Sequence, residues 1–121
     1  MSEFVCNETG FSMVFSNGIR ISVQFGQGNY CDNKNKTLTN FNRVTSTTAE
    51  IASMPVNGHG EWFQFVTYGI ANDVKGWLTT DEVAGWIEIV SNAKSFAELK
   101  ERQELIQHIM SKMNQVRGEE E

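Results

Sequence analysis

The residues of this 121-residue chain that are best suited to bind a ligand gather in one stretch, from Arg20 to Tyr30. Arg20 and Gln24 alternate with apolar residues along an expected strand, which then runs into Phe25, Asn29 and Tyr30. Glycines between them let a ligand approach the backbone, amide groups hydrogen-bond to ring edges, and aromatic side chains stack on ring faces. This mixture is typical of a site for a purine-type ligand. The alternative is structural: the glycines shape a turn, Tyr30 closes the core and Asn29 caps local backbone groups.

Phosphate groups on such a ligand would need cations, and further aromatic faces would have to come from elsewhere in the chain. The candidate cations are Arg20, Arg43, Lys75 and Arg102, and the further aromatic candidates are Phe65 and Trp77. Ten Lys and Arg residues against fifteen Asp and Glu residues give a net charge of −5, so these cations must be gathered locally. A pocket between subunits would do this by bringing Arg102 of one chain to the loop of another. The same charge disfavours nucleic acids and anionic membranes as partners.

Groups suited to catalysis are scarce. The only histidines are His59 and His108, and the chain has no nucleophile motif, phosphate loop or zinc-binding spacing. Cys6 and Cys31 are too few for a disulfide scaffold, and we interpret Cys31 as a packed loop residue and His108 as a helix-surface residue. Cleavage of a phosphodiester or glycosidic bond needs a metal site or an acid–base pair. We therefore expect binding without turnover, with no metal and no cofactor.

The length and the 40% hydrophobic content predict a single α+β domain. We expect an antiparallel sheet of hairpins within residues 1–78, two helices within residues 79–117, and an acidic tail at 118–121. The chain has no apolar run long enough to cross a membrane and no signal-peptide pattern at its start. These features predict a soluble protein of the cytoplasm.

Alternating apolar residues on both sides of Ser16-Asn17-Gly18 predict the first hairpin. A two-residue Asn17-Gly18 turn would split the apolar residues between the two faces of the sheet. A three-residue loop with Gly18 in the left-handed conformation keeps them on one face. It pairs Phe15 with Ile19, Met13 with Ile21 and Phe11 with Val23.

The next stretch, Gly26 to Arg43, is polar and rich in Asn, and so long a loop in a small domain is expected to be either functional or disordered. Strand patterns return at Thr47–Met54 and Glu61–Thr67. The connection Asn57–Gly60 predicts a second hairpin between them, and its second strand is expected to be covered on both sides.

Two capping signatures, Thr79–Glu82 and Ser95–Glu98, predict the starts of two helices. The second helix is expected to run for about six turns to the vicinity of Gly118. Its apolar stripe is longer than one small sheet can cover, and such exposed stripes mark interfaces. We therefore predict a homo-oligomer held through Ile109, Met110, Met113 and Val116.

Three blocks of the sequence carry a resemblance to known proteins. They are Asn17–Asn33 (NGIRISVQFGQGNYCDN), Ala49–Ala52 and Val74–Ala84, which all lie within residues 17–84, a stretch of roughly half the chain. These blocks resemble a group of small phage proteins, and within that group they are similar to the Thoeris anti-defence sponges. The resemblance implies an oligomeric protein without catalysis that sequesters cyclic ADP-ribose-type signals made by bacterial TIR-domain enzymes, or cyclic oligonucleotides, in the infected cell. No ligand-binding motif of that family carries over residue by residue.

A different class of function stays open at this point. A phage interaction protein of the anti-CRISPR kind would block a host enzyme with the acidic second half of the chain. Fifteen acidic residues in 121 is an ordinary content, whereas nucleic-acid mimics crowd far more acid onto one face.

Overall fold

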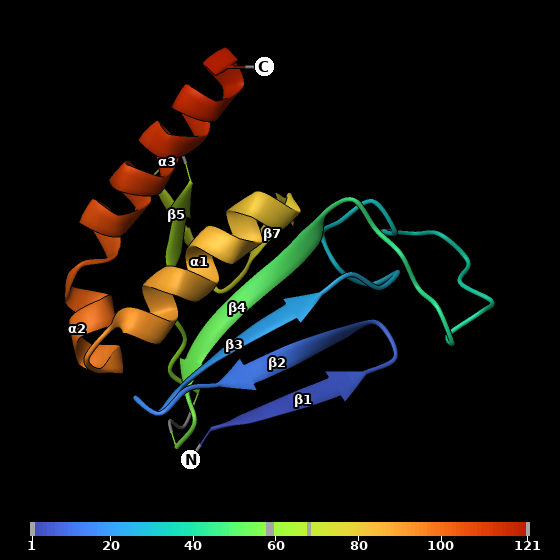
Figure 1. Ribbon diagram of the computed structural model, residues 1–121, viewed down its shortest axis with the longest axis horizontal. Coiled ribbons are helices and arrows are strands. Elements are labelled where there is room, and N and C mark those ends of the chain that lie inside the picture. The colour runs from blue at the N-terminus through green and yellow to red at the C-terminus, as the bar shows by residue number, and fades with distance from the viewer. Residues whose placement is uncertain (1, 58–59, 68, 121) are drawn as a thin grey trace.

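The computed structural model describes residues 2–57, 60–67 and 69–120, with the backbone alone at 67 and 113–120. The strands are β1 (Glu3–Asn7), β2 (Gly10–Val14), β3 (Ile19–Gln24), β4 (Ala49–Pro55), β5 (Phe65–Thr67), β6 (Ile70–Asn72) and β7 (Lys75–Leu78). Five of them form an antiparallel sheet in the order β1-β2-β3-β4-β7, and helices follow at the C-terminal end (Figure 1). The predicted α+β class is confirmed.

The first hairpin has the predicted register. Met13 pairs with Ile21 and Phe11 with Val23, and the Phe15 amide donates to the Ile19 carbonyl oxygen at 2.9 Å. Gly18 has a φ of +81°, a left-handed conformation that glycine adopts without steric strain. The three-residue loop therefore keeps the apolar residues of both strands on one face.

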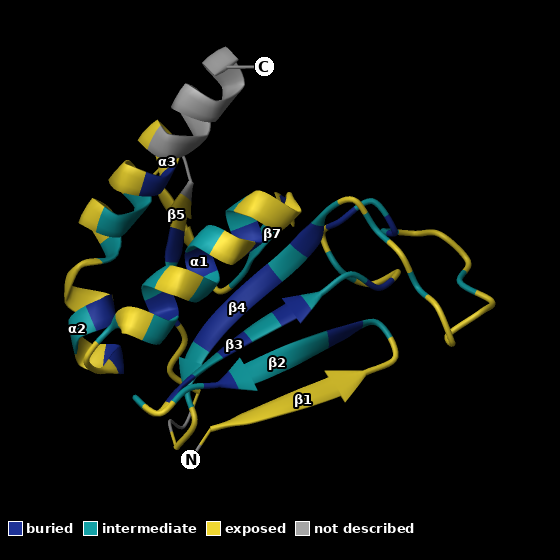
Figure 2. Ribbon diagram, viewed as in Figure 1, coloured by how far each residue is buried: buried dark blue, intermediate teal, exposed yellow. Residues whose placement is uncertain are grey.

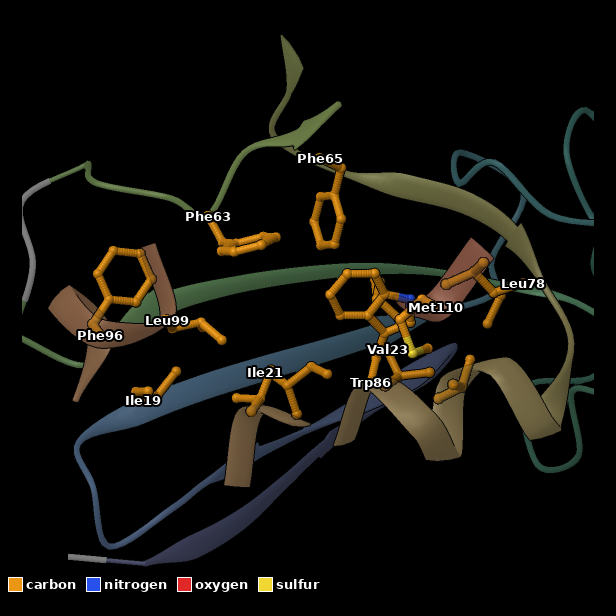
Figure 3. Close-up of a cluster of buried hydrophobic side chains, with 14 residues drawn as sticks. Ile19, Ile21, Val23, Phe63, Phe65, Leu78, Trp86, Phe96, Leu99 and Met110 are labelled. Carbon is orange, nitrogen blue, oxygen red and sulfur yellow. The ribbon is translucent and has the colours of Figure 1, made fainter. Parts of the chain in front are cut away.

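That apolar face carries the core, because Ile19, Ile21 and Val23 are buried against helix α1 (Thr80–Asn92). Figure 3 shows these side chains beneath three aromatic rings from other elements. The Phe63 and Phe65 rings meet edge to face with centroids 5.0 Å apart, and Trp86 of α1 lies 5.9 Å and 5.2 Å from them. Edge-to-face packing of this kind adds specific stabilisation to the burial of apolar area.

The predicted second hairpin is wrong. β4 pairs with β3 on one side and with β7 on the other, while β5 pairs with β6 in a separate two-stranded sheet. β7 pairs with the edge of β4 that the predicted hairpin would have assigned to β5. The segment before β5 contacts β4 through one backbone hydrogen bond, from the Phe63 amide to the Ser53 carbonyl oxygen at 2.8 Å. Trp62 and Val66 are exposed, so this segment is covered on one side only.

The predicted capping box at the start of α1 is confirmed. The Glu82 amide donates to Thr79 Oγ1 at 3.3 Å, and the Thr79 amide donates to Glu82 Oε1 at 3.1 Å. At the other end of α1, Asn17 Nδ2 donates to the carbonyl oxygens of Val90 and Ala93, each at 2.9 Å. The turn of the first hairpin thus satisfies carbonyl groups that a helix end leaves unpaired.

The second predicted helix is two helices, α2 (Phe96–Glu101) and α3 (Gln103–Glu120), which meet at Arg102. The backbone of Arg102 leaves the helical region at φ −99° and ψ 9°, and this change of direction lets α2 bury Phe96 and Leu99. α3 then rises away from the sheet (Figure 1). Its helical backbone continues through residues 118–120, which we had expected to form an acidic tail.

The long loop between β3 and β4 is ordered by side chains that bond to backbone groups. Asn33 is buried, and its Nδ2 donates to the carbonyl oxygens of Phe25 at 2.8 Å and Thr45 at 3.0 Å. The Asp32 amide donates to Thr48 Oγ1 at 2.9 Å. Side-chain amide and hydroxyl groups therefore form the hydrogen bonds that a neighbouring strand would otherwise offer to the N–H and C=O groups of this loop.

Candidate functional site: a cleft beside Trp77

The site is built around an irregularity in β7. Ala49 pairs with Leu78 and Ile51 with Lys75, so two residues of β7, Gly76 and Trp77, lie opposite the single residue between them on β4. This is a β-bulge, a feature that re-aims side chains beside functional sites. Trp77 has a φ of +59°, and a bulky side chain in the left-handed region is a strained conformation. Trp77 is also 54% exposed, so burial does not explain why the strain is kept.

Trp77 forms one wall of a cleft of about 430 Å³ between β7, β5, α1 and α3. The residues that line the cleft are Val66, Lys75, Gly76, Trp77, Leu78, Glu82, Trp86, Gln107, Met110 and Ser111. They combine an exposed indole, an ammonium group, a carboxylate and a hydroxyl over an apolar floor. The bulge therefore places Lys75 and Trp77, two of the predicted ligand-binding residues, at the same cleft.

Gln107 holds the far wall of this cleft in place. Its Oε1 accepts from the Val66 amide at 2.6 Å, and its Nε2 donates to the Gln103 carbonyl oxygen at 3.0 Å. α3 is thereby tied to β5. The amide of Gln107 is engaged in this link, so the polar groups best placed for a ligand are those of Lys75 and Ser111.

A second cluster is formed by Asn29, Tyr30, Lys34 and Glu50, and it meets β7 where Tyr30 contacts Gly76 and Trp77. Glu50 accepts from Asn29 Nδ2 at 3.2 Å and from the Tyr30 amide at 2.9 Å. Lys34 Nζ lies 4.6 Å from the centroid of the Tyr30 ring, a cation–π geometry, and Tyr30 is 48% exposed. Asn29 Oδ1 accepts from the Gly26 amide at 2.8 Å, as the structural alternative for Asn29 predicted.

Arg20 and Gln24 lie on the sheet face opposite α1. Gln24 is held by its neighbours, since its Nε2 donates to Ser22 Oγ at 3.1 Å and its Oε1 accepts from Asn7 Nδ2 at 3.0 Å. Arg20 Nε is buried and has no hydrogen-bond partner within the described part of the chain. Neither residue lines the Trp77 cleft.

Three other predicted ligand residues lie away from the cleft. Phe25 lines a separate, mostly apolar groove of about 210 Å³ beside the start of α1. Arg43 is exposed on the long loop, and Arg102 is exposed where α2 meets α3. The bulge at Gly76 and Trp77 thus brings together a smaller set of residues than the sequence suggested.

Phe65 was predicted as an aromatic face for a ligand, and this prediction is wrong. Its ring is buried between Phe63 and Trp86 in the core, because the alternation of this segment turns Phe63 and Phe65 inward together.

The predicted interface on α3 also needs correction at Met110. This side chain is 4% exposed and packs towards Gly85 of α1 as part of the core, so it is not available to a second subunit. Ile109 is 46% exposed, as predicted. The side chains of Met113 and Val116 lie outside the described residues, as does His59. His108 is exposed on α3 and Cys31 is buried in the loop, both as predicted.

Sequence reasoning missed Glu50 and Gly76, although Glu50 organises the Tyr30 loop and Gly76 allows β7 to approach it. A β-carbon on Gly76 would lie 2.8 Å from the Tyr30 carbonyl oxygen and closer still to the Tyr30 Cβ. A glycine beside an exposed tryptophan in a strand pattern was the available signal, since such glycines mark bulges and close approaches.

Among residues 2–57, 60–66 and 69–112, whose side chains the structure describes, no group of three or more His, Cys, Asp or Glu residues is placed to hold a metal ion. Across the same ranges, no helix combines the length and apolar character needed to cross a membrane. No family model, curated protein or solved structure matches this chain.

Proposed function

We propose that the protein binds a small nucleotide-derived signal in the Trp77 cleft and holds it without cleaving it. The observation that carries this proposal is the exposed, left-handed Trp77 at the wall of a cleft that also contains Lys75. Backbone strain at an exposed aromatic residue is retained where the position of the side chain matters. A flat ring presented to solvent beside a cation suits a ligand with a base and a phosphate.

Each part of such a ligand has a counterpart at the cleft. The base stacks on the indole of Trp77, an interaction worth about 1–3 kcal/mol per base in nucleic-acid-binding proteins. The ammonium group of Lys75 attracts a phosphate, and the hydroxyl of Ser111 lies at the same cleft to meet a sugar hydroxyl. These groups provide recognition, and we propose that the ligand leaves the cleft chemically unchanged.

The resemblance of three sequence blocks to phage anti-defence sponges supports the biological setting of the proposal. In that setting the protein acts in the cytoplasm of an infected bacterium, where it withdraws a cyclic ADP-ribose-type signal or a cyclic oligonucleotide from its receptor. We further propose self-association through the exposed part of α3 that includes Ile109, which would set several clefts in one assembly.

A thermal-shift screen tests the binding step against cyclic ADP-ribose isomers, cyclic dinucleotides, cyclic trinucleotides and NAD. A ligand at 100 times its dissociation constant stabilises the folded state by about 2.7 kcal/mol. We expect Trp77→Ala to weaken binding by about 5- to 150-fold and Trp77→Phe to weaken it less, because phenylalanine retains a stacking face. If none of these compounds raises the melting temperature of the wild type, the proposal is wrong.

Charge-matched variants separate a phosphate contact from a general charge effect. Lys75→Gln and Lys94→Gln remove the same charge, but Lys94 is exposed and does not line the cleft. We expect weaker binding only in Lys75→Gln. Equal weakening in both variants would show that net charge, and not the cleft, attracts the ligand.

Recovery of the ligand tests the absence of turnover. The protein is incubated with the compound that stabilises it and then denatured, and the released molecule is analysed by mass. We expect the intact mass at full recovery. More than one product molecule per subunit would identify an enzyme.

A further inference from the structure

The five-stranded sheet has one protected edge and one bare edge. At the protected edge, β7 is bulged and the Trp77 amide donates to the Tyr30 carbonyl oxygen at 2.8 Å, so the long loop lies against it. At the bare edge, all five residues of β1 are exposed, as Figure 2 shows, and Phe4 is 81% exposed. β1 contains no Pro, Lys or Arg, the residues that usually keep edge strands from pairing.

The direction of the free backbone groups on β1 follows from the neighbouring strands. The Phe15 amide points at β3, because it donates to the Ile19 carbonyl oxygen. Hydrogen-bonding directions alternate along an antiparallel strand, so Ser12 and Val14 direct their backbone groups at β1. Val5 pairs with Ser12, and the residues on either side of Val5, Phe4 and Cys6, therefore direct their N–H and C=O groups to solvent.

We propose that β1 pairs in antiparallel fashion with β1 of a second copy of this chain, about a twofold axis at Val5. This register uses all five residues of the strand and hydrogen-bonds Phe4 to the partner's Cys6. Val5 faces the partner's Val5 in a pair without hydrogen bonds, the geometry in which side chains approach most closely. The two sheets become one sheet of ten strands.

The chemistry of both sheet faces favours a second copy as the occupant. Residues paired across a ladder share a face, so Phe4 lies beside Met13, and Cys6 lies beside Phe11, on the face that carries the core. The pairing joins these into one apolar row across the seam: Phe11, Cys6, the partner's Phe4 and the partner's Met13. Phe4, which is 81% exposed in one chain, then has the partner's Cys6 on its other side.

Charge on the other face is compatible with the same register. Glu3 is the only charged residue of β1, and it lies opposite the partner's Asn7. No like charges are opposed, although each chain has a net charge of −5. The interface is independent of the Trp77 cleft, which lies towards the opposite edge of the sheet.

Directed cross-linking tests the register. In a Cys6→Ser background, Val5→Cys places two thiols on the twofold axis, where Cα atoms in a pair without hydrogen bonds are about 4.5 Å apart, within the range that a disulfide spans. We expect a mild oxidant to convert the larger part of this variant to a covalent dimer. Glu8→Cys in the same background is the control, because Glu8 is exposed in the turn after β1 and has no partner in this register.

A second measurement uses no new thiol. In an Ile109→Glu background, which removes the α3 contact proposed above, we expect sedimentation velocity to show a shift from monomer towards dimer as the concentration rises. Phe4→Lys in the same background should reduce this shift while the melting temperature of the monomer stays the same. Cross-linking of Glu8→Cys as fast as Val5→Cys, or an Ile109→Glu protein that stays monomeric at its highest soluble concentration, would overturn the proposal. Dimers of Ile109→Glu that persist unchanged when Phe4→Lys is added would place the contact elsewhere and would also overturn it.

Discussion

The amide of Trp77 donates a hydrogen bond of 2.8 Å to the carbonyl oxygen of Tyr30. This bond joins the bulged strand β7 to the Asn-rich loop, two segments that are far apart in the sequence. Gly76 lies between them with no side chain in the way. A substitution at this contact should therefore destabilise both the loop and the strand.

The contact between Gly76 and Tyr30 gives the first prediction. Gly76→Ala should lower the free energy of unfolding by about 1–3 kcal/mol, because its β-carbon would overlap the Tyr30 backbone and Cβ. Gly28→Ala is the matched control, since a β-carbon there meets nothing within 4 Å, and its effect should stay within about 0.5 kcal/mol. Urea denaturation measures both. Equal stability of the two variants would mean that the loop moves aside freely.

The strain at Trp77 gives the second prediction. Trp77→Gly and Trp77→Ala lose the same indole contacts, but only glycine adopts a φ of +59° without steric cost. The glycine variant should therefore be more stable than the alanine variant by about 1 kcal/mol. Thermal denaturation compares the two directly. If alanine were the more stable, the left-handed conformation would not persist in solution.

The side chain of Asn17 gives the third prediction. Asn17→Asp keeps the size of the residue and its acceptor for the Ile19 amide, but it replaces the donor to Val90 and Ala93 with a second oxygen. A carboxylate would then face carbonyl oxygens at the negative end of α1. We expect a loss of about 2–4 kcal/mol for Asn17→Asp and a smaller loss for Asn17→Ala. Wild-type stability of Asn17→Asp at neutral pH would contradict the contact.

Two neighbouring residues of α3 give the fourth prediction. Met110→Glu should unfold or strongly destabilise the protein, because it places a charge in the core. Ile109→Glu should leave the melting temperature nearly unchanged, since Ile109 is exposed, while it reduces self-association through α3. Calorimetry and light scattering on the same samples separate the two effects. Unfolding of Ile109→Glu would show that its side chain packs within the chain.

The sequence predicted those parts of the fold in which the local pattern and the tertiary contacts agree. The register of the β2–β3 hairpin followed from strict alternation around Gly18, and the start of α1 from Thr79 and Glu82. The second hairpin failed because alternation at Phe63 and Phe65 shows which side is buried but not which strand lies alongside. The break at Arg102 was missed because no Gly or Pro marks it, and because Leu99 and Ile106 are seven residues apart, a spacing that also fits one face of a continuous helix.

The sequence predicted which kinds of residue form the candidate site, but not which of these residues lie together. Lys75 and Trp77 were recognised as a cation and an aromatic face, but their meeting at one cleft depends on a bulge that pairs two residues of β7 with one of β4. Gly76 indicates a bulge in this strand, but no local pattern shows which residues of β4 lie opposite it. Tyr30 was expected at the same site as Arg20, whereas it lies against Gly76 beside a different strand.

The two cysteines of this protein differ in access to solvent, and this difference makes them natural reporters. Cys6 is exposed on β1, whereas the thiol of Cys31 is fully buried and donates to the Gly26 carbonyl oxygen at 3.4 Å. A thiol reagent can reach Cys31 only when the loop opens, so its labelling rate measures the free energy of that local opening. Cys6 lies on the bare sheet edge, so its labelling slows when a second strand covers that edge. In one labelling time course, Cys31 therefore reports the opening of the loop, and Cys6 independently reports whether the bare sheet edge is covered.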